Sequence, residues 1–410
     1  MIETSLELMA RRHGNKVLYD AKGNPSVFVP FYQMQSSFLD ASLPGHAHPA
    51  FTTGGTLYDR ILLGQYMASE LENNGTLYSL PGRAPRVNLG MDPFLTRMQA
   101  FRYGVSGMTI ADHGLILLMC HKFGWNPHGN NNYGHDYRDG TRWETGKSIT
   151  VGLKRVQFGW EYTALKAHTS DLTNQPYNSP EYWEKGKQVG GVMVESQISE
   201  SNYSGLNTIT GSGPRSWCLG NDLGSLNDVV GNASEQVYGV RLVNLEIQII
   251  PDNDAAAPGA DLSATSTLWK AILPNSTDDG YTLVEPGTPG TVHYAWLNNK
   301  VTLVARALAD EEFTGEYKNT QLKDVAVDST TLPYVPYILK ELGLAPITGM
   351  TVPGVIYIQL TKDERVARRG GHYLNPSNAG PASLDFGNHR SYAYAPYGGR
   401  PRSLWVPDTW

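Results

Sequence analysis

The hydrophobic and polar positions near the start of the chain predict a short helix followed by a β-hairpin. Leu6, Leu8 and Met9 have helical spacing. Apolar runs at 17–19 and 27–31 flank the turn-forming triplet Gly23, Asn24 and Pro25. We expect residues 1–45 to form an N-terminal arm that contacts other subunits or a particle.

Two helices are predicted in the next part of the chain. Asp92 and Pro93 suit an N-cap and a first turn, so a helix should run from Asp92 to about residue 102. A second helix should run from about 110 to 123, because apolar residues recur there with helical spacing. We expect both helices to pack on a small antiparallel sheet and to supply core residues.

The remaining apolar patterns indicate strands separated by loops. Residues 240–250 alternate like one strand with one buried face, and residues 300–305 and 355–360 also favour strands, with a helix at about 334–342. Glycine, proline and small polar residues predict loops at 126–150 and 251–290. Residues 151–205 are typical of an insertion with some β structure, whose aromatic residues we expect to fill a satellite core.

Composition and charge exclude several classes of protein. The chain has 410 residues, two cysteines and a net charge of −6, with no basic patch suited to nucleic acid or an anionic membrane. Cys120 and Cys218 have apolar neighbours and are expected to be buried. No apolar run is long enough to span a bilayer, and the first sixteen residues lack the apolar core of a signal peptide, so we expect cytoplasmic synthesis.

The C-terminal stretch 368–402 has the composition of a binding loop between two fixed ends. Arg368, Arg369, Gly370 and Gly371 precede it, and 398–402 close it with two further glycines and two arginines. Glycine pairs suit tight turns or close backbone approach. Between them lie many Tyr, Ser, Asn and Gly residues, which supply rigid contact area and adaptable hydrogen bonds in binding loops.

The same stretch lacks Lys, Glu, Gln, Met and Trp altogether. These five residue types cannot be encoded by a triplet that ends in a pyrimidine. Random replacement of adenines in AAC codons would instead produce Tyr, His, Asp, Ser, Gly, Ala, Pro and Leu. The composition therefore favours a segment diversified through its adenines.

Residues 367–401, ARRGGHYLNPSNAGPASLDFGNHRSYAYAPYGGRP, resemble the variable region of diversity-generating retroelement target proteins, a family that includes phage tropism determinants. Residues 231–235 and 241–251 resemble the GNVWEW segment and its continuation in the formylglycine-generating-enzyme type of C-type lectin fold, and 78–82 and 129–134 extend the similarity. Ala233, Ser234 and Gln236 depart from this pattern, which often has Val, Trp and Trp, so packing at that turn should differ.

This resemblance implies an α+β chain with a C-type lectin fold. Residues 46–410 would form the ligand-binding domain, with insertions near 151–205 and 251–290 and a variable region at 368–402. The implied function is non-catalytic binding of a bacterial surface protein or glycan by a phage-encoded protein at a tail or fibre tip of the virion. The implied partners also include phage tail proteins and further copies of this chain, with a trimer as one option, but no nucleic acid and no inserted membrane.

The residues expected to point outward and bind the ligand come from the variable region. Tyr392, Tyr394 and Pro396 should lie on one side of an extended segment, with Ser391, Ala393 and Ala395 facing the scaffold. The complete set is His372, Tyr373, Leu374, Asn375, Asp385, Gly387, Asn388, His389, Tyr392, Tyr394 and Pro396.

An enzyme and a plain carbohydrate-binding lectin are the alternatives. Formylglycine-generating enzymes use a cysteine pair near their final segment, but no cysteine follows Cys218 here, and the His-x-x-x-His-x-Glu pattern of related iron enzymes does not occur. His121, His128 and His135 are spaced by seven residues, and 252–254 lack the alternate spacing of a calcium loop. We therefore expect no catalytic residue, no metal and no cofactor.

Overall fold

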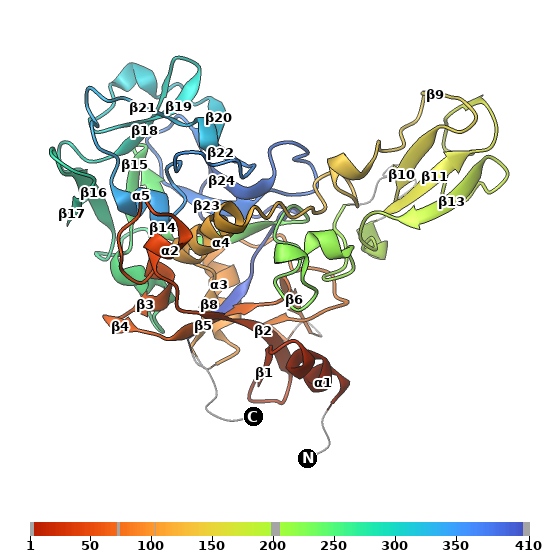
Figure 1. Ribbon diagram of the computed structural model, residues 1–410, viewed down its shortest axis with the longest axis horizontal. Coiled ribbons are helices and arrows are strands. Elements are labelled where there is room, and N and C mark those ends of the chain that lie inside the picture. The colour runs from red at the N-terminus through yellow and green to blue at the C-terminus, as the bar shows by residue number, and fades with distance from the viewer. Residues whose placement is uncertain (1–3, 72–73, 103, 198–205, 405–410) are drawn as a thin grey trace.

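The computed structural model describes residues 4–71, 74–102, 104–197 and 206–404. The chain is a mixed α+β protein, about 17% helical and 33% strand, which confirms the expected class at this level. A body built on two large sheets carries a smaller β-rich projection (Figure 1).

The first large sheet joins the two ends of the chain. Its five strands lie in the order β1-β2-β5-β26-β8, and all neighbours are antiparallel. The predicted hairpin is confirmed as β1 and β2, and pairing of β2 with β5 makes this hairpin of the expected N-terminal arm part of the body's sheet. The strands are β1 Lys16–Tyr19, β2 Pro25–Tyr32, β5 Arg60–Gly64, β8 Val105–Gly107 and β26 Pro401–Ser403.

The second sheet has twelve strands and forms the other half of the body. Its main path is β20-β22-β24-β23-β14-β15-β18-β19-β21, with β16, β17 and β25 attached at its sides. The strands are β14 Ser234–Val243, β15 Glu246–Ile249, β16 Lys270–Pro274, β17 Tyr281–Val284, β18 His293–Leu297, β19 Lys300–Val304, β20 Tyr317–Gln321, β21 Ala326–Val327, β22 Val355–Gln359, β23 Arg365–Gly370, β24 Gly380–Asn388 and β25 Tyr397–Gly398.

The prediction of one strand over 240–250 is wrong, because the chain turns back within it. Asn244 and Leu245 both have positive φ, 51° and 61°, which is the backbone of a tight two-residue hairpin turn. Strands β14 and β15 then pair, with Val243 opposite Glu246. Both strands are buried on both faces, so alternation did not reveal the turn.

Helix α4, Ile110–Phe123, lies in the core between the two sheets (Figure 1). Thr109 caps it and forms a capping box with Asp112, while Gly124 ends it with φ 65°. Nearly all its residues are buried, which confirms its predicted role in the core. The described helices are α1 Ser5–Arg12, α2 Ser36–Leu39, α3 Met91–Gln99, α4 Ile110–Phe123 and α5 Tyr337–Glu341.

Helix α3 begins differently from the prediction. Gly90 occupies the N-cap position, and Asp92 lies in the first turn, where its negative charge favours the helix N-terminus. The Met91 backbone N–H donates to the Arg390 carbonyl at 2.8 Å. The C-terminal stretch therefore accepts a hydrogen bond from a backbone N–H at the start of α3. This contact could not be read from local sequence.

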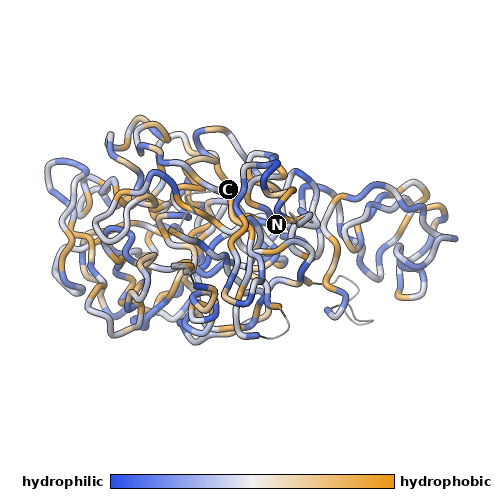
Figure 2. The backbone as a smooth tube through the Cα atoms, turned by 90° about the horizontal axis from the view of Figure 1, so that it is seen from below, coloured by the Kyte–Doolittle hydropathy of each residue, from blue (hydrophilic) through white to orange (hydrophobic). Residues whose placement is uncertain are grey.

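The strands between residues 148 and 188 project from the body as a separate small β unit (Figures 1 and 2). Its aromatic residues form a cluster around Trp143, Tyr162 and Trp183, which confirms the predicted satellite core. The unit begins before residue 151, and residues 198–205 of the predicted insertion lie outside the described part of the chain. Its strands are β9 Ser148–Ile149, β10 Lys154–Gln157, β11 Trp160–Ala164, β12 His168–Thr169 and β13 Trp183–Gln188.

The segment 251–290 is not the simple loop that its composition predicts. A short 3₁₀ turn, Pro251–Ala256, leads to strands β16 and β17, which pair with each other and extend the large sheet. Short hairpins complete the body: β3 Thr52–Thr53 with β4 Thr56–Leu57, and β6 Ala68–Glu70 with β7 Leu77–Ser79.

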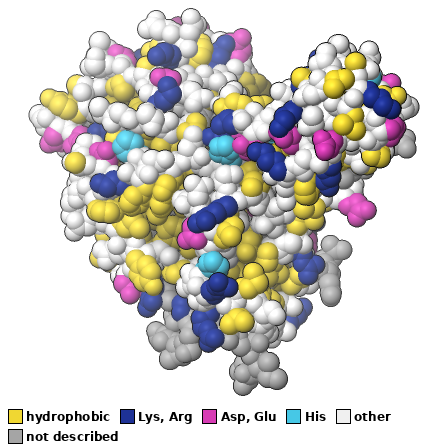
Figure 3. Space-filling view, turned by 45° about the vertical axis from the view of Figure 1, so that its right-hand side comes forward, with side chains coloured by type: hydrophobic (Ala, Val, Ile, Leu, Met, Phe, Trp, Pro, Cys, Tyr) yellow, Lys and Arg dark blue, Asp and Glu magenta, His cyan; other side chains and the backbone are white. Residues whose placement is uncertain are grey.

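Acidic and basic side chains are interspersed on the face shown in Figure 3. Among the described residues, no helix is long and apolar enough to cross a membrane.

We predict that Trp183→Ala destabilises the projecting unit and leaves the body folded. Trp183 is 2% exposed, and its indole N–H donates to the Asn174 carbonyl at 2.8 Å. Removing such a side chain costs about 3–5 kcal/mol of local stability. Hydrogen exchange should accelerate in 143–188 but not in α4. Leu165→Ala, at a position 47% exposed, is the control that should change neither.

Candidate functional site

The C-terminal stretch runs from one large sheet to the other. It leaves the large sheet through β23, returns as β24, passes through an exposed loop at 389–396 and pairs with β14 through β25. It ends as β26 in the first sheet, between β5 and β8. Both ends of the stretch are therefore fixed by sheet pairing.

Four arginines that flank the stretch are completely buried: Arg368, Arg369, Arg400 and Arg402. Glu235 on β14 lies between two of them. Arg369 Nη1 donates to its Oε2 at 2.6 Å, and Arg400 Nε donates to its Oε1 at 2.8 Å. One carboxylate thus joins the beginning and the end of the stretch, which are far apart in sequence.

Further contacts of these arginines reach the first sheet and helix α4. Arg400 Nη1 donates to the carbonyls of Gly64 and Gln65 at 2.8 and 2.9 Å. Arg402 Nε lies 2.8 Å from Asp112 Oδ2, the same carboxylate that closes the capping box of α4. Burial raises the pKa of Asp112, and the Arg402 charge opposes that rise. The arginines therefore tie the stretch to the core helix.

The glycines at the two ends of the stretch serve the two predicted purposes, a tight turn and close backbone approach. Gly370 and Gly371 have φ of 83° and 74°, a conformation that glycine adopts without strain. A Cβ on Gly399 would lie 2.6 Å from the Phe94 ring. The first pair is needed for a turn, and Gly399 is needed for close packing.

A pocket of about 280 Å³ opens over this scaffold. Four of the predicted residues line it, namely His372, Asn375, Asp385 and Asn388. Tyrosines from other strands contribute to its wall: Tyr317 and Tyr357 stack with ring centroids 5.6 Å apart. The pocket therefore combines aromatic surface with amide, hydroxyl and carboxylate groups. The complete lining is Ser234, Tyr317, Val355, Tyr357, Gly371, His372, Asn375, Asn378, Ser383, Asp385, Asn388 and Tyr397.

The charge of the Asp385 carboxylate in the pocket is nearly balanced by the charge of Arg368. Burial raises the pKa of Asp385, while the Arg368 guanidinium beside it and the Gly387 N–H oppose the rise. Arg368 also lies 4.1 Å from the centroid of the Tyr397 ring. Burial lowers the pKa of His372 to about 4, so this imidazole is neutral at pH 7. Such a site suits neutral polar groups, hydroxyls and amides above all.

Exposed tyrosines stand beside the pocket. Tyr392 and Tyr394 are 37% and 44% exposed, and their ring centroids lie 5.9 and 5.6 Å from that of Tyr397. Leu374 and His389 are also exposed. These four residues, together with the pocket, form one surface for a partner, and we name this combination the display surface.

The exposed loop is held in place by Arg390, which the sequence analysis did not select. Its Nε and Nη2 donate to the two carboxylate oxygens of Glu364 at 2.8 and 2.9 Å, and its Nη1 donates to Asp92 at 2.7 Å. Bidentate arginine–carboxylate pairs fix orientation as well as charge. The loop therefore presents its tyrosines from a defined backbone.

Three of the predicted outward residues are buried, so that part of the prediction is wrong. Tyr373 is 3% exposed and packs on Tyr133, with ring centroids 5.9 Å apart. Pro396 is buried where its carbonyl accepts from the Ser234 N–H at 2.7 Å. Gly387 is buried, and a Cβ there would lie 2.9 Å from Tyr357.

The predicted alternation over 391–396 is also wrong. The segment turns instead of running as an extended strand, and Ser391 and Ala393 are exposed together with both tyrosines. Hydrogen bonds from the Tyr392 N–H to the His389 carbonyl and from the Tyr397 N–H to the Tyr394 carbonyl close the two turns. A turning chain has no period of two, so small residues need not face the scaffold.

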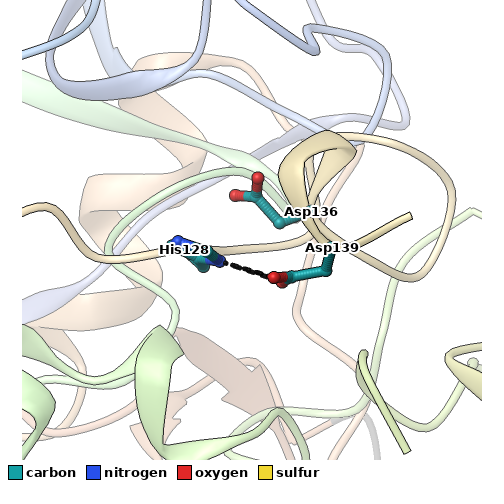
Figure 4. A group of neighbouring side chains, drawn as sticks. All are labelled: His128, Asp136 and Asp139. Carbon is teal, nitrogen blue, oxygen red and sulfur yellow. Dashed lines mark hydrogen bonds and ion pairs between the residues drawn. The ribbon is translucent and has the colours of Figure 1, made fainter. Parts of the chain in front are cut away.

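One group of side chains has the spacing of a metal site: His128, Asp136 and Asp139 lie with ligand atoms within 4.8 Å of one another. Figure 4 shows His128 directed at Asp139, with Asp136 apart from that pair. Asp136 already accepts hydrogen bonds from Arg138, Asn131 and the Gly129 N–H. Its oxygens serve to fix the loop, and we infer a structural role for the group.

The other residues considered for chemistry have ordinary structural roles. His121 pairs with Asp40 at 3.1 Å, a partner that neither His128 nor His135 shares. His135 is buried, which lowers its pKa to about 4. Cys120 and Cys218 are buried as expected, and burial raises the pKa of both thiols to about 12. Thiols held in the neutral form are poor nucleophiles.

Comparison of the chain with models of known protein families finds no match, and neither does comparison with curated protein sequences. The geometry of the display surface is therefore the basis for the functional conclusion.

We predict that Glu235→Gln strongly destabilises the body. The change leaves two buried guanidinium groups without their countercharge, and breaking a buried ion pair in this way costs about 3–5 kcal/mol. Unfolding in urea, monitored by tryptophan fluorescence, measures the loss.

Glu312→Gln is the control for this experiment. Glu312 pairs with Arg306 at 2.8 Å near the surface, where such a pair contributes about 0–1 kcal/mol. Equal stability of the two variants would show that Glu235 does not hold the stretch in place.

Proposed function

We propose that this chain is a non-catalytic ligand-binding protein whose C-terminal stretch, 368–402, is a variable region diversified by a retroelement. The observation that carries the proposal is the division of that stretch into buried ends and an exposed centre. All four flanking arginines are fully buried, whereas Tyr392, Tyr394, His389 and Leu374 are exposed beside a pocket. Substitution at exposed positions costs little stability, which a diversified site requires.

The finer fold assignment belongs to the same proposal. We assign the body to the C-type lectin fold of the formylglycine-generating-enzyme type, with the projecting unit as an insertion. The sequence resemblance at 231–235, 241–251 and 367–401 supports this assignment, and the mixed α+β class is compatible with it.

The chemistry of the display surface supports a protein or glycan of a bacterial surface as the ligand. Tyrosine rings offer flat apolar area, and the amides of Asn375 and Asn388 together with neutral His372 offer donors and acceptors. We place the protein at a phage tail or fibre tip, assembled as a homo-oligomer, because several weak contacts then act together.

An enzymatic function has less support. The described part of the chain places no thiol or carboxylate pair in the pocket, whose only acidic residue is Asp385. A plain lectin remains the second candidate, and the aromatic wall of the pocket favours it over an enzyme.

We predict that Tyr392→Ala, Tyr394→Ala and Asn388→Ala, combined in one variant, weaken binding to whole host bacteria by tenfold or more, in the range of about 2 kcal/mol or above expected for anchor residues. The melting temperature should change little, because both tyrosines are exposed and Asn388 loses one side-chain hydrogen bond, to the Tyr397 hydroxyl. Binding is measured with labelled protein on cells.

The matched control carries Tyr32→Ala and Tyr334→Ala, two tyrosines outside the stretch that are 60% and 45% exposed. It should bind as well as the unmodified protein. Undiminished binding by the triple variant, or equal loss in the control, would contradict the proposal.

We also predict where natural variants of the gene differ. Changes should fall on exposed positions such as Leu374, His389, Tyr392 and Tyr394, and correspond to adenines in a nearby template copy. Arg369, Arg400 and Glu235 should not change, because each is buried in one ion network. Sequencing several isolates provides the measurement, and changes spread evenly over the chain would exclude a diversified region.

A further inference from the structure

A second cavity, of about 380 Å³, lies on the body and shares no residue with the pocket of the display surface. Its walls come from α4, α5, β15, β17, the 3₁₀ turn Pro251–Ala256 and the segment 46–57. Most of the wall is apolar: Ile110, Ile249, Ile250, Leu283, Ile338 and Leu342. Its size and lining are those of a small-molecule site.

Aromatic rings form one side of this cavity. Tyr281 and Tyr337 meet edge to face with centroids 5.2 Å apart, and His46 lies 5.6 Å from Tyr337. All three residues line the cavity. Tyrosine faces attract cations as well as apolar groups.

Glu341 places a carboxylate in this largely apolar wall, and its side chain is fully buried. Its Oε1 lies 2.7 Å from His46 Nε2. Its Oε2 is buried and has no hydrogen-bond partner among the residues that the structure describes. Burial raises the pKa of Glu341, while the nearby Ser36 hydroxyl and His46 oppose that rise. The Ser36 hydroxyl forms no well-aligned hydrogen bond with the carboxylate.

A second acceptor in the same wall is also unsatisfied. Asn253 is 7% exposed, its Nδ2 donates to the Ala50 carbonyl at 3.4 Å, and its Oδ1 is buried with no partner within the described ranges. Asp252 adds a second acidic residue to the lining. Buried acceptors without donors are costly, and a ligand that donates hydrogen bonds removes that cost.

We propose that this cavity binds a small organic amine, with its hydrocarbon part against the apolar wall and its ammonium group against Glu341 and Asn253. The ammonium group supplies donors only, which matches a site whose unsatisfied atoms are acceptors. The cavity holds a short chain or a single ring. This binding is separate from ligand recognition by the display surface and does not depend on it.

The test compares three probes of equal length on the unmodified protein by isothermal titration calorimetry: hexylamine, 1-hexanol and hexanoate. Hexylamine should bind about tenfold more tightly than hexanol, because a hydrogen bond to a charged group is stronger than a neutral one. Hexanoate should bind more weakly than either, since it places a second negative charge beside Glu341. Equal binding of hexylamine and hexanol, or no saturable binding of hexylamine, overturns the proposal.

A variant then locates the interaction. Glu341→Gln should lose the preference for hexylamine and keep the affinity for hexanol, whereas Glu312→Gln, outside the cavity, should behave like the unmodified protein. A folded Glu341→Gln protein that still prefers hexylamine overturns the assignment of the ammonium group. Should that variant fail to fold, the comparison of the three probes on the unmodified protein decides by itself.

Discussion

The arrangement of the whole C-terminal stretch depends on one buried ion network. Glu235 forms ion pairs with Arg369 at the beginning of the stretch and with Arg400 near its end. The nitrogen–oxygen distance is 2.6 Å in each pair. Charges removed from water are stable only when they are paired and hydrogen-bonded. Because these partners come from β14, β23 and the approach to β26, the network exists only in the folded chain and holds both ends of the stretch to one strand.

This network lies below an exposed surface and is separate from it. The arginines satisfy backbone carbonyls and carboxylates below the surface, and Arg390 pins the exposed loop to Glu364 and Asp92. The exposed side chains of Tyr392 and Tyr394 belong to neither ion network. A site built on such a base tolerates many side chains, since its backbone is positioned by residues outside the contact area.

The pocket of the display surface and the cavity beside Glu341 differ in chemistry, and this difference accounts for the different ligands proposed for them. The pocket of the display surface has aromatic walls and an acid balanced by Arg368, which suits neutral polar groups. The second cavity is apolar and carries Glu341 with an unsatisfied oxygen, which suits a cation. The projecting unit adds a third element, stabilised by its own aromatic cluster.

Local sequence by itself determined the elements that depend on neighbouring residues. The first hairpin, helix α4, the satellite core and the binding-loop composition of 368–402 were all readable, because turn chemistry and periodicity act over a few residues. Only the tertiary structure decided that Asn244 and Leu245 form a turn, that Tyr373 is buried on Tyr133, and that Glu235 pairs with two arginines. The contacts of Tyr373 and Glu235 are with residues more than a hundred positions away, and the turn lies between strands that are buried on both faces. Long-range contacts and two-sided burial leave no periodic signal in the sequence.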